Sequence, residues 1–521
     1  MMTVRLNTTI QQMTVPDGVP KQFEKMLDWL AAEPEDDCLA ELAGLRGHLD
    51  ELRMCALPVN EIFPCLEQLE LRALDIAGRF RAQLLGASLP LPKALHDATG
   101  GLVSGLQDLV GVLQRVLTSI DEGPNDTKRA LEEILIGGRA LRLLGEGFVL
   151  GGMRGTDPAP GLWRQAFAVL EHLLPYLEQP IAGLQQAAAP ATLQFKRMAA
   201  ISALQPESLT ARELAWIHEY LEMVAASAEV ANAPLLPEGA CFWADPGEDE
   251  APVPYSRRVA PARRGLVFFS AFGMAKRVSE QVDWLERRIA EAEVVGLERD
   301  GELLDPDASG LPFGLTPVEV LSLLNRLRER WIAPPSREHS RRPRLYSAQV
   351  CVGLRSIWAV HKGLQPKGGI VEWTVCNESP GGYGIVSVSE MHAELVAGMV
   401  LGLRRDASEA WSICLVRWIR SNEAEQIELG LQVVGSTCTP VSIGFRGGEL
   451  RSTTSALLLP PLPGVRNNVA ILAPAGTYTS RRFVLVREGQ HVYIAQGRVL
   501  GLDLQTASVE LFQYEIDPFP I

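Results

Sequence analysis

The sequence predicts a multidomain α + β protein, in which an N-terminal all-α helical array or bundle precedes an antiparallel β-barrel and a further β extension. Three observations predict this order. At 521 residues the chain is too long for a single hydrophobic core. Apolar residues recur every three to four positions as far as about residue 333, and every second position after Tyr346. Pro334 and Pro335 stand between the two patterns and end helical structure.

The first part of the chain has the helical period. Residues 1–20 show no period and are expected to form an N-terminal arm, and residues 21–333 a helical domain. No fixed repeat length is present, which favours an irregular array over a named solenoid. Proline and glycine separate the runs, for example at Pro190 and Pro206. Helical runs are predicted at 23–30, 39–52, 62–84, 102–120, 129–144, 162–177, 211–226, 274–292 and 317–331.

The helical pattern is interrupted at residues 232–262. This segment holds six prolines among acidic residues, which predicts a long surface loop within the helical domain. A second interruption, at 334–345, is expected to be a hinge that carries a cluster of arginines.

The rest of the chain alternates in the manner of β-strands. Short runs of β-branched and aromatic residues are separated by Gly, Asn, Asp and Ser, which is typical of a small antiparallel barrel. We expect this barrel at 346–436 and a C-terminal β extension at 437–521. Strands are predicted at 346–354, 370–376, 384–388, 399–403, 411–419, 427–434, 441–445, 455–459, 469–472, 482–486, 491–496 and 509–514.

Composition excludes several classes of function. A formal charge of −14 argues against wide binding to nucleic acid or anionic membranes. The eight cysteines form no CxxC pair and no Cys/His zinc spacing, so we expect buried thiols and neither a metal nor a cofactor. The N-terminal residues lack the pattern of a signal peptide, and no apolar run is long enough for an integral membrane segment. A cytoplasmic protein is expected.

Two polar features carry nearly all the recognisable chemistry. One is an Asn-x-Ser-x-x-Gly turn, in which small polar side chains and a glycine let a ligand approach the backbone. The other is a group of guanidinium side chains upstream, which can grip phosphates at two points and stack on flat bases. Together they predict a receptor for a phosphorylated nucleotide, and the candidate site residues are Arg337, Arg341, Arg342, Arg344, Asn377, Ser379 and Gly382.

These features resemble the PilZ family of cyclic-di-GMP receptor domains. Arginines precede the first strand, the turn matches the family's Asp/Asn-x-Ser-x-x-Gly, and two later strands contain Leu-Val-Arg-Trp (415–418) and Glu-Leu-Gly-Leu-Gln (428–432). The resemblance covers about residues 337–436. It implies a six-stranded barrel that binds cyclic-di-GMP at its rim and does no chemistry on it. Arg337 and Arg341 have the family's Arg-x-x-x-Arg spacing; if Arg344 is instead the second arginine, Ser340 occupies the first position.

The resemblance implies a cyclic-di-GMP effector. It would relay the level of the second messenger to an unidentified protein partner through the helical domain, in bacterial motility, attachment or secretion. A degenerate PilZ-like scaffold, which binds partners without nucleotide, is the alternative. A third hypothesis is an enzyme with its site in the helical domain, but no catalytic motif supports it, so we expect a protein that is not an enzyme.

Overall fold

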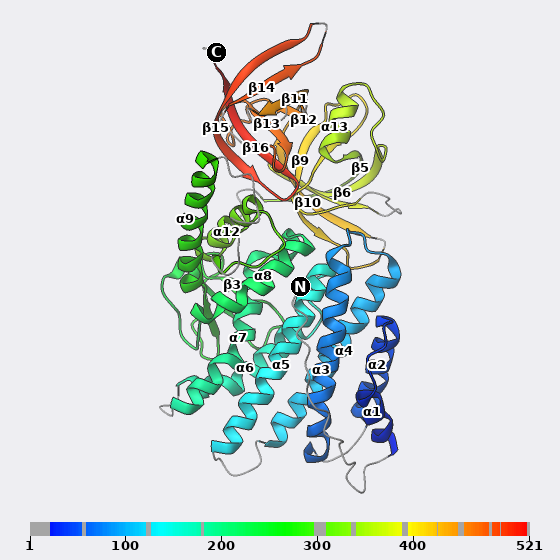
Figure 1. Ribbon diagram of the computed structural model, residues 1–521, viewed down its shortest axis with the longest axis vertical. Helices are drawn as coiled ribbons and strands as arrows, with labels where there is room; N and C mark the ends of the chain where they lie inside the picture. Colours follow the sequence, from blue (N-terminus) through cyan, green and yellow to red (C-terminus); the bar gives the residue numbers. More distant parts are fainter. Residues whose placement is uncertain are drawn as a thin grey trace.

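The computed structural model has its helices at one end and two β-barrels at the other (Figure 1). The predicted fold class is therefore confirmed. The expected arm at 1–20 and Arg337 lie outside the residues that the structure describes. Those residues are 21–54, 59–120, 127–178, 182–295, 309–334, 340–387, 394–424, 426–445, 453–478, 482–489 and 491–517.

The helices pack around one large apolar core. Leucines and valines at spacings of three and four bury one face of each helix, as in Leu106 and Leu109 of one helix and Leu141 and Leu144 of the next. The helices are α1 (Lys21–Ala31), α2 (Cys38–Met54), α3 (Val59–Leu85), α4 (Lys93–Ile120), α5 (Thr127–Arg154), α6 (Leu162–Glu178), α7 (Ala182–Leu204), α8 (Ala211–Val224), α9 (Phe272–Val295) and α12 (Pro317–Ile332), with the short 3₁₀ turn η1 (Pro206–Ser208) after α7.

One expected break is wrong. Pro190, predicted to separate helical runs, lies inside α7. A proline inside a helix removes one hydrogen bond and crowds the preceding turn, and the close packing of the neighbouring alanines offsets this cost. Ala188 is fully buried, and Ala191 packs so closely on α5 that a Cβ at Gly138 would lie 3.1 Å from its Cβ.

The segment 232–262, predicted to be one long loop, contains strands. They belong to a small antiparallel sheet with the order β1-β4-β2-β3, formed by β1 (Glu229–Ala231), β2 (Cys241–Ala244), β3 (Val253–Pro254) and β4 (Val267–Ser270). These strands are too short to show a period of two, and all four side chains of β2 are buried. The acidic part nearby has a structural role, because the Asp249 carboxylate accepts hydrogen bonds from the backbone N–H groups of Trp163 (3.0 Å) and Arg164 (3.1 Å) at the start of α6.

The first barrel closes in the order β10-β7-β6-β5-β8-β9, with antiparallel pairs throughout. Its interior is filled by alternate residues such as Val350, Val375, Ile385 and Leu429. Helix α13 (Leu354–His361) follows the first strand. The strands are β5 (Arg342–Val352), β6 (Val371–Ser379), β7 (Gly382–Ser387), β8 (Val400–Arg404), β9 (Ser412–Arg420) and β10 (Ile427–Gly435).

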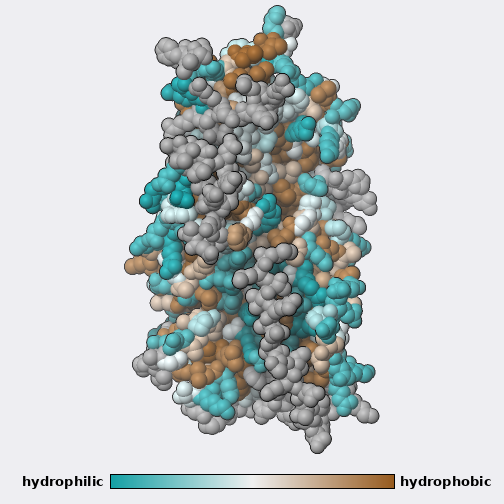
Figure 2. Space-filling view, in the orientation of Figure 1, coloured by the Kyte–Doolittle hydropathy of each residue, from teal (hydrophilic) through white to brown (hydrophobic). Residues whose placement is uncertain are grey.

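The C-terminal β extension is a second closed barrel, with the order β11-β12-β13-β16-β15-β14. Its centre is aromatic and includes Phe483, Phe512 and Tyr514. Apolar side chains gather on the surface at the far end of the molecule (Figure 2). Val492 and Ile494 of this barrel are exposed. The strands are β11 (Thr439–Phe445), β12 (Thr454–Leu459), β13 (Ala470–Pro474), β14 (Arg482–Arg487), β15 (Tyr493–Gln505) and β16 (Val509–Ile516).

The three parts are joined by packing and by hydrogen bonds. The two barrels share an apolar cluster that includes Leu415 from the first and Leu472 from the second. The first barrel meets the helical domain beside β9, where the N–H of Ser421 donates to the carbonyl of Gly155 (2.7 Å) and Nε2 of His96 lies 3.0 Å from the Ser421 carbonyl. Within the described residues, no helix combines the length and hydropathy that a membrane crossing requires.

Candidate functional site

Of the predicted arginines that the structure describes, Arg342 and Arg344 lie on the first strand of the barrel, and Arg341 directly precedes it. The sequence predicted that the first strand starts at Leu345 or Tyr346, yet β5 starts at Arg342. The reason is the length of its partner, since β6 continues to Ser379 and lies opposite the extra residues. Arg342 faces Glu378 in the pairing register and is exposed. Arg342 and Arg344 are therefore held beside the Asn-x-Ser-x-x-Gly segment.

The Asn-x-Ser-x-x-Gly segment forms the β6–β7 hairpin. Ser379 pairs directly with Gly382, so the turn itself consists of Pro380 and Gly381, and the Ser379 hydroxyl lies within 3.4 Å of the Gly382 carbonyl. Glycine is required at position 382, because a Cβ there would lie 1.9 Å from the Leu431 carbonyl oxygen on β10. The close approach of the two backbones fixes the rim of the barrel.

Asn377 lies one step inside this hairpin and has an unused acceptor. Its side chain covers Gly384 so closely that a Cβ at Gly384 would be 2.5 Å from Nδ2. Its Oδ1 atom is buried, and no described residue donates a hydrogen bond to it. An unsatisfied buried acceptor costs about 1–3 kcal/mol, which is recovered when a ligand supplies a donor. A predicted recognition residue is thus held ready for a hydrogen-bond donor.

A tryptophan lies farther along the same outer surface. Gly430 of β10 pairs with Gly384 of β7, and the Trp418 indole covers Gly430, where a Cβ would lie 1.9 Å from Nε1. The neighbouring residues Ile385 and Leu429 point into the barrel core, so the two glycines face outward. We call the surface formed by Asn377, Gly384, Gly430 and Trp418 the outer strip.

Two guanidinium groups flank the indole at one end of the outer strip. The Cζ atom of Arg341 lies 5.9 Å from the centre of the Trp418 ring, and that of Arg420 lies 5.2 Å from it. Both distances suit cation–π contacts. Of the predicted arginines, Arg341 is the one that the described structure brings to the outer strip.

Arg344 is engaged elsewhere on the hairpin. Its Nε donates to Oε1 of Glu378 (3.2 Å), and the hydroxyl of Tyr346 donates to the other carboxylate oxygen (3.0 Å). Burial raises the pKa of Tyr346, and the bond to the Glu378 carboxylate raises it further, so this hydroxyl stays protonated. Arg344 therefore has a protein partner before any ligand arrives.

Sequence reasoning gave no role to Trp418, Arg420, Gly384 or Gly430. The available signal was a pair of glycines inside strands that were otherwise rich in β-branched residues. Glycine in a strand often marks a place where another group approaches the backbone closely. Which aromatic residue uses the space depends on strand register, and register appears only in the fold.

Two parts of the chain match models of one protein family. Residues 24–234 match the family model of the cyclic-di-GMP receptor FimW, N-terminal domain, and residues 360–440 match the model of its middle PilZ domain. A cyclic-di-GMP receptor FimW from Pseudomonas aeruginosa is 31% identical over 102 residues, which are 19% of this chain and 17% of that receptor. The alignment thus spans less than a fifth of the relative's own length. No solved structure matches the chain.

Proposed function

We propose that this chain, which carries a PilZ-type domain behind a helical domain of the FimW type, is a receptor for cyclic-di-GMP. The observation that carries the proposal is the meeting of Arg341 and Trp418 on the outer strip that also holds the unused acceptor of Asn377. Cyclic-di-GMP has two phosphates and two guanines. The Arg341 guanidinium suits the phosphates, and the Trp418 ring and the Asn377 amide oxygen suit the guanines.

Each side chain suits one part of this ligand. The Trp418 indole can stack on a guanine, and the Arg341 guanidinium can move from the indole to a phosphate or to the other face of the base. The free Oδ1 of Asn377 accepts a hydrogen bond, and guanine presents N–H donors along its edge. Arg337, Arg342 and Arg344 are proposed to complete the phosphate contacts. Ser379 and Gly382 hold the hairpin, and the role is binding without a cofactor or a catalytic step.

Arg420 gives the bound ligand a route to the helical domain. Its guanidinium contacts the Trp418 ring on one side and forms ion pairs with Asp157 (3.2 Å) and Glu207 (3.2 Å) of the helical domain on the other. An anionic ligand on the strip competes with these two carboxylates for the same cation. We propose that this competition loosens the contact between domains, and that the helical domain then signals to a protein partner in the bacterial cytoplasm.

The alternative is a scaffold whose barrel binds protein partners and no nucleotide. The ion pair between Arg344 and Glu378 favours it, because this arginine is already neutralised without a ligand. In that case the outer strip is a structural feature alone. Titration with nucleotide separates the two functions.

Isothermal titration of the full chain with cyclic-di-GMP tests the proposal. We expect saturable binding, and a loss of at least about tenfold in affinity in Arg341→Ala, equivalent to about 1.4 kcal/mol. Arg487→Ala is the matched control. Arg487 also contacts an aromatic ring, that of Tyr493 (5.4 Å), but both residues belong to the second barrel, whereas the outer strip belongs to the first. Absence of heat at tens of micromolar ligand rejects the receptor function. Equal affinity in Arg341→Ala and Arg487→Ala rejects the site.

A further inference from the structure

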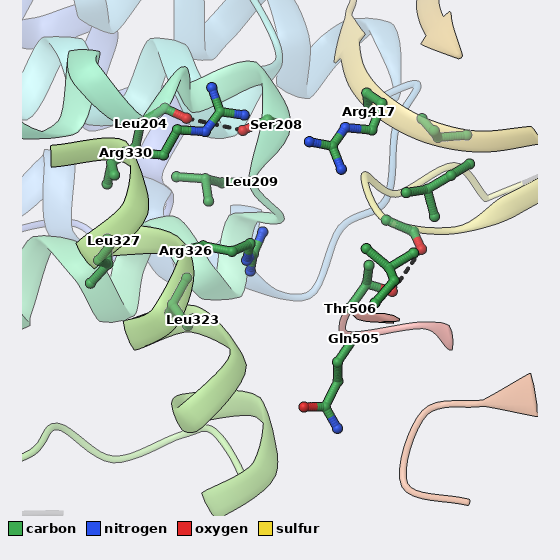
Figure 3. Close-up of a pocket in the computed structure, with 14 residues that line it drawn as sticks. Leu204, Ser208, Leu209, Leu323, Arg326, Leu327, Arg330, Arg417, Gln505 and Thr506 are labelled. Atoms are coloured by element: carbon green, nitrogen blue, oxygen red, sulfur yellow. Dashed lines mark hydrogen bonds between the residues drawn. The ribbon is translucent and has the colours of Figure 1, made fainter. Parts of the chain in front are cut away.

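A cavity lined by arginines lies where the helical domain meets both barrels. Its volume is about 50 Å³, and it lies between α12 and η1 on one side and β9 and β15 on the other. Figure 3 shows the side chains of Arg326, Arg330 and Arg417 facing the same space from opposite walls. The remaining wall is largely apolar and includes Leu209, Leu327 and Leu504.

Arg417 reaches this cavity because of a β-bulge. In the pairing of β9 with β10, Trp418 lies opposite Gly430 and Val416 lies opposite Leu431, so Arg417 is the extra residue between them. Side chains of a regular strand point alternately into and out of the barrel, and a bulge breaks this alternation. Two adjacent side chains can therefore both point away from the barrel core here: Trp418 toward the outer strip and Arg417 toward the cavity.

The cavity concentrates positive charge in a chain whose formal charge is −14. Burial, together with repulsion by Arg417, Arg257 and Arg326, lowers the pKa of Arg330 to about 10, against a partial opposing effect of Glu329. Repulsion between like charges in a small cavity raises the free energy of the folded state, and a bound anion reduces this repulsion.

Protein groups neutralise this charge only in part. Arg326 forms an ion pair with Glu213, but its Nε is buried without a partner among the described residues. Arg330 donates to Gln205 Oε1 (2.7 Å), which is an uncharged acceptor. Across the described parts of the chain, Arg417 forms no hydrogen bond and no ion pair. Arg330 and Arg417 therefore have no ion-pair partner within the described residues, and Glu329 offsets their charge only in part. The Arg417 side chain is exposed, so an anion can reach it.

We propose that this cavity is a second anion site, which binds the phosphate group of a small phosphorylated ligand or free phosphate. Guanidinium forks pair with phosphate oxygens at two points each, and cations on opposite walls match an anion with oxygens on all sides better than a planar carboxylate. One buried water needs roughly 10–15 Å³ of cavity volume. This cavity has about 50 Å³, which is enough for a group of the size of one phosphate. The site is separate from the outer strip and does not depend on it.

Calorimetric titration of the full chain with inorganic phosphate, and in a second arm with AMP, tests the site. Chloride at equal ionic strength supplies the reference, because any anion screens repelling charges. We expect saturable binding in the wild type, a loss of at least about tenfold in Arg417→Gln (about 1.4 kcal/mol), and a smaller loss in Arg417→Lys. Arg487→Gln is the control and keeps wild-type binding. Tighter binding of phosphate than of AMP identifies the free ion as the ligand, and the reverse identifies a phosphate monoester.

Two outcomes overturn the inference. These are heat no greater than that of chloride, and equal affinity of Arg417→Gln and the wild type for phosphate. A melting curve without phosphate shows that Arg417→Gln is folded, and removal of one repelling charge should leave its Tm unchanged or raise it. Failure of cyclic-di-GMP binding with retained phosphate binding would reject the proposed receptor function and leave this site intact.

Discussion

Replacing Gly430 by alanine should displace the indole on which the proposed receptor function depends. The new Cβ would lie 1.9 Å from Nε1 of Trp418 and 2.1 Å from Cε2, whereas ordinary contacts start at 3.4 Å. The ring must therefore move by about 1.5 Å. Because the conflict is between one methyl group and one side chain on the outer surface, the barrel core is untouched, and we expect a folded protein.

The size of the effect follows from two contributions. Overpacking of this kind costs about 1–3 kcal/mol of stability. Stacking of a base on an aromatic side chain is worth about 1–3 kcal/mol, so losing it lowers the affinity for cyclic-di-GMP by about 5- to 150-fold. Urea denaturation measures the first contribution, and isothermal titration well below the melting temperature measures the second.

Gly444→Ala is the matched control. Gly444 is also a strand residue, on β11 of the second barrel, but its nearest neighbour to a new Cβ is Thr453 Cγ2 at 3.9 Å. This variant should bind cyclic-di-GMP as the wild type does and should be at least as stable. If Gly430→Ala binds with the affinity of Gly444→Ala, stacking on Trp418 is no part of recognition and the reasoning fails.

Three further predictions concern the relay, the unused acceptor and the helical core. Backbone amide hydrogen exchange near Asp157 should become faster when cyclic-di-GMP is added to the wild type. In Arg420→Gln it should be fast with or without the ligand, and an increase on adding ligand as large as that of the wild type would contradict the relay. Asn377→Leu removes an unsatisfied acceptor, so urea denaturation should show equal or higher stability while calorimetry shows weaker binding; unchanged binding would exclude Asn377 from recognition. Burial alone would raise the pKa of Glu146, but the hydrogen bond and charge of His218, together with the charges of Arg81 and Arg197, outweigh it and lower the pKa from 4.5 to about 2. The stability present above pH 4.5 should therefore fall by on the order of 3 kcal/mol as the pH drops to 2. That loss should be absent in Glu146→Gln, and a wild-type slope in this variant would show that other groups cause the acid sensitivity.

The sequence was most informative where the pattern was long. Strands such as β5 and β10 alternate over nine or more residues, so they could be placed within a few residues before the fold was known. The strands of the small sheet have two to four residues and were missed. A strand that short has no period to detect.

The candidate site was predictable in part for a related reason. The Asn-x-Ser-x-x-Gly hairpin is local, so its residues could be named from their spacing alone. The contact of Trp418 with Gly430 is not local, because it depends on which residues of two strands lie opposite one another. The bulge at Arg417 shifts that register by one residue, and nothing in the sequence marks it. Arg420 likewise owes its role to a carboxylate in the helical domain, more than two hundred residues away.

A double-mutant cycle between Arg341 and Trp418, with each variant titrated with cyclic-di-GMP, tests the central claim most directly. We expect Arg341→Ala and Trp418→Ala each to lower the affinity for cyclic-di-GMP by at least about tenfold. The affinity of the double variant should be little lower than that of the single variant that binds less tightly, because both side chains act on one bound ligand through a shared contact. Wild-type affinity in Trp418→Ala, or no saturable binding by the wild type, would contradict it.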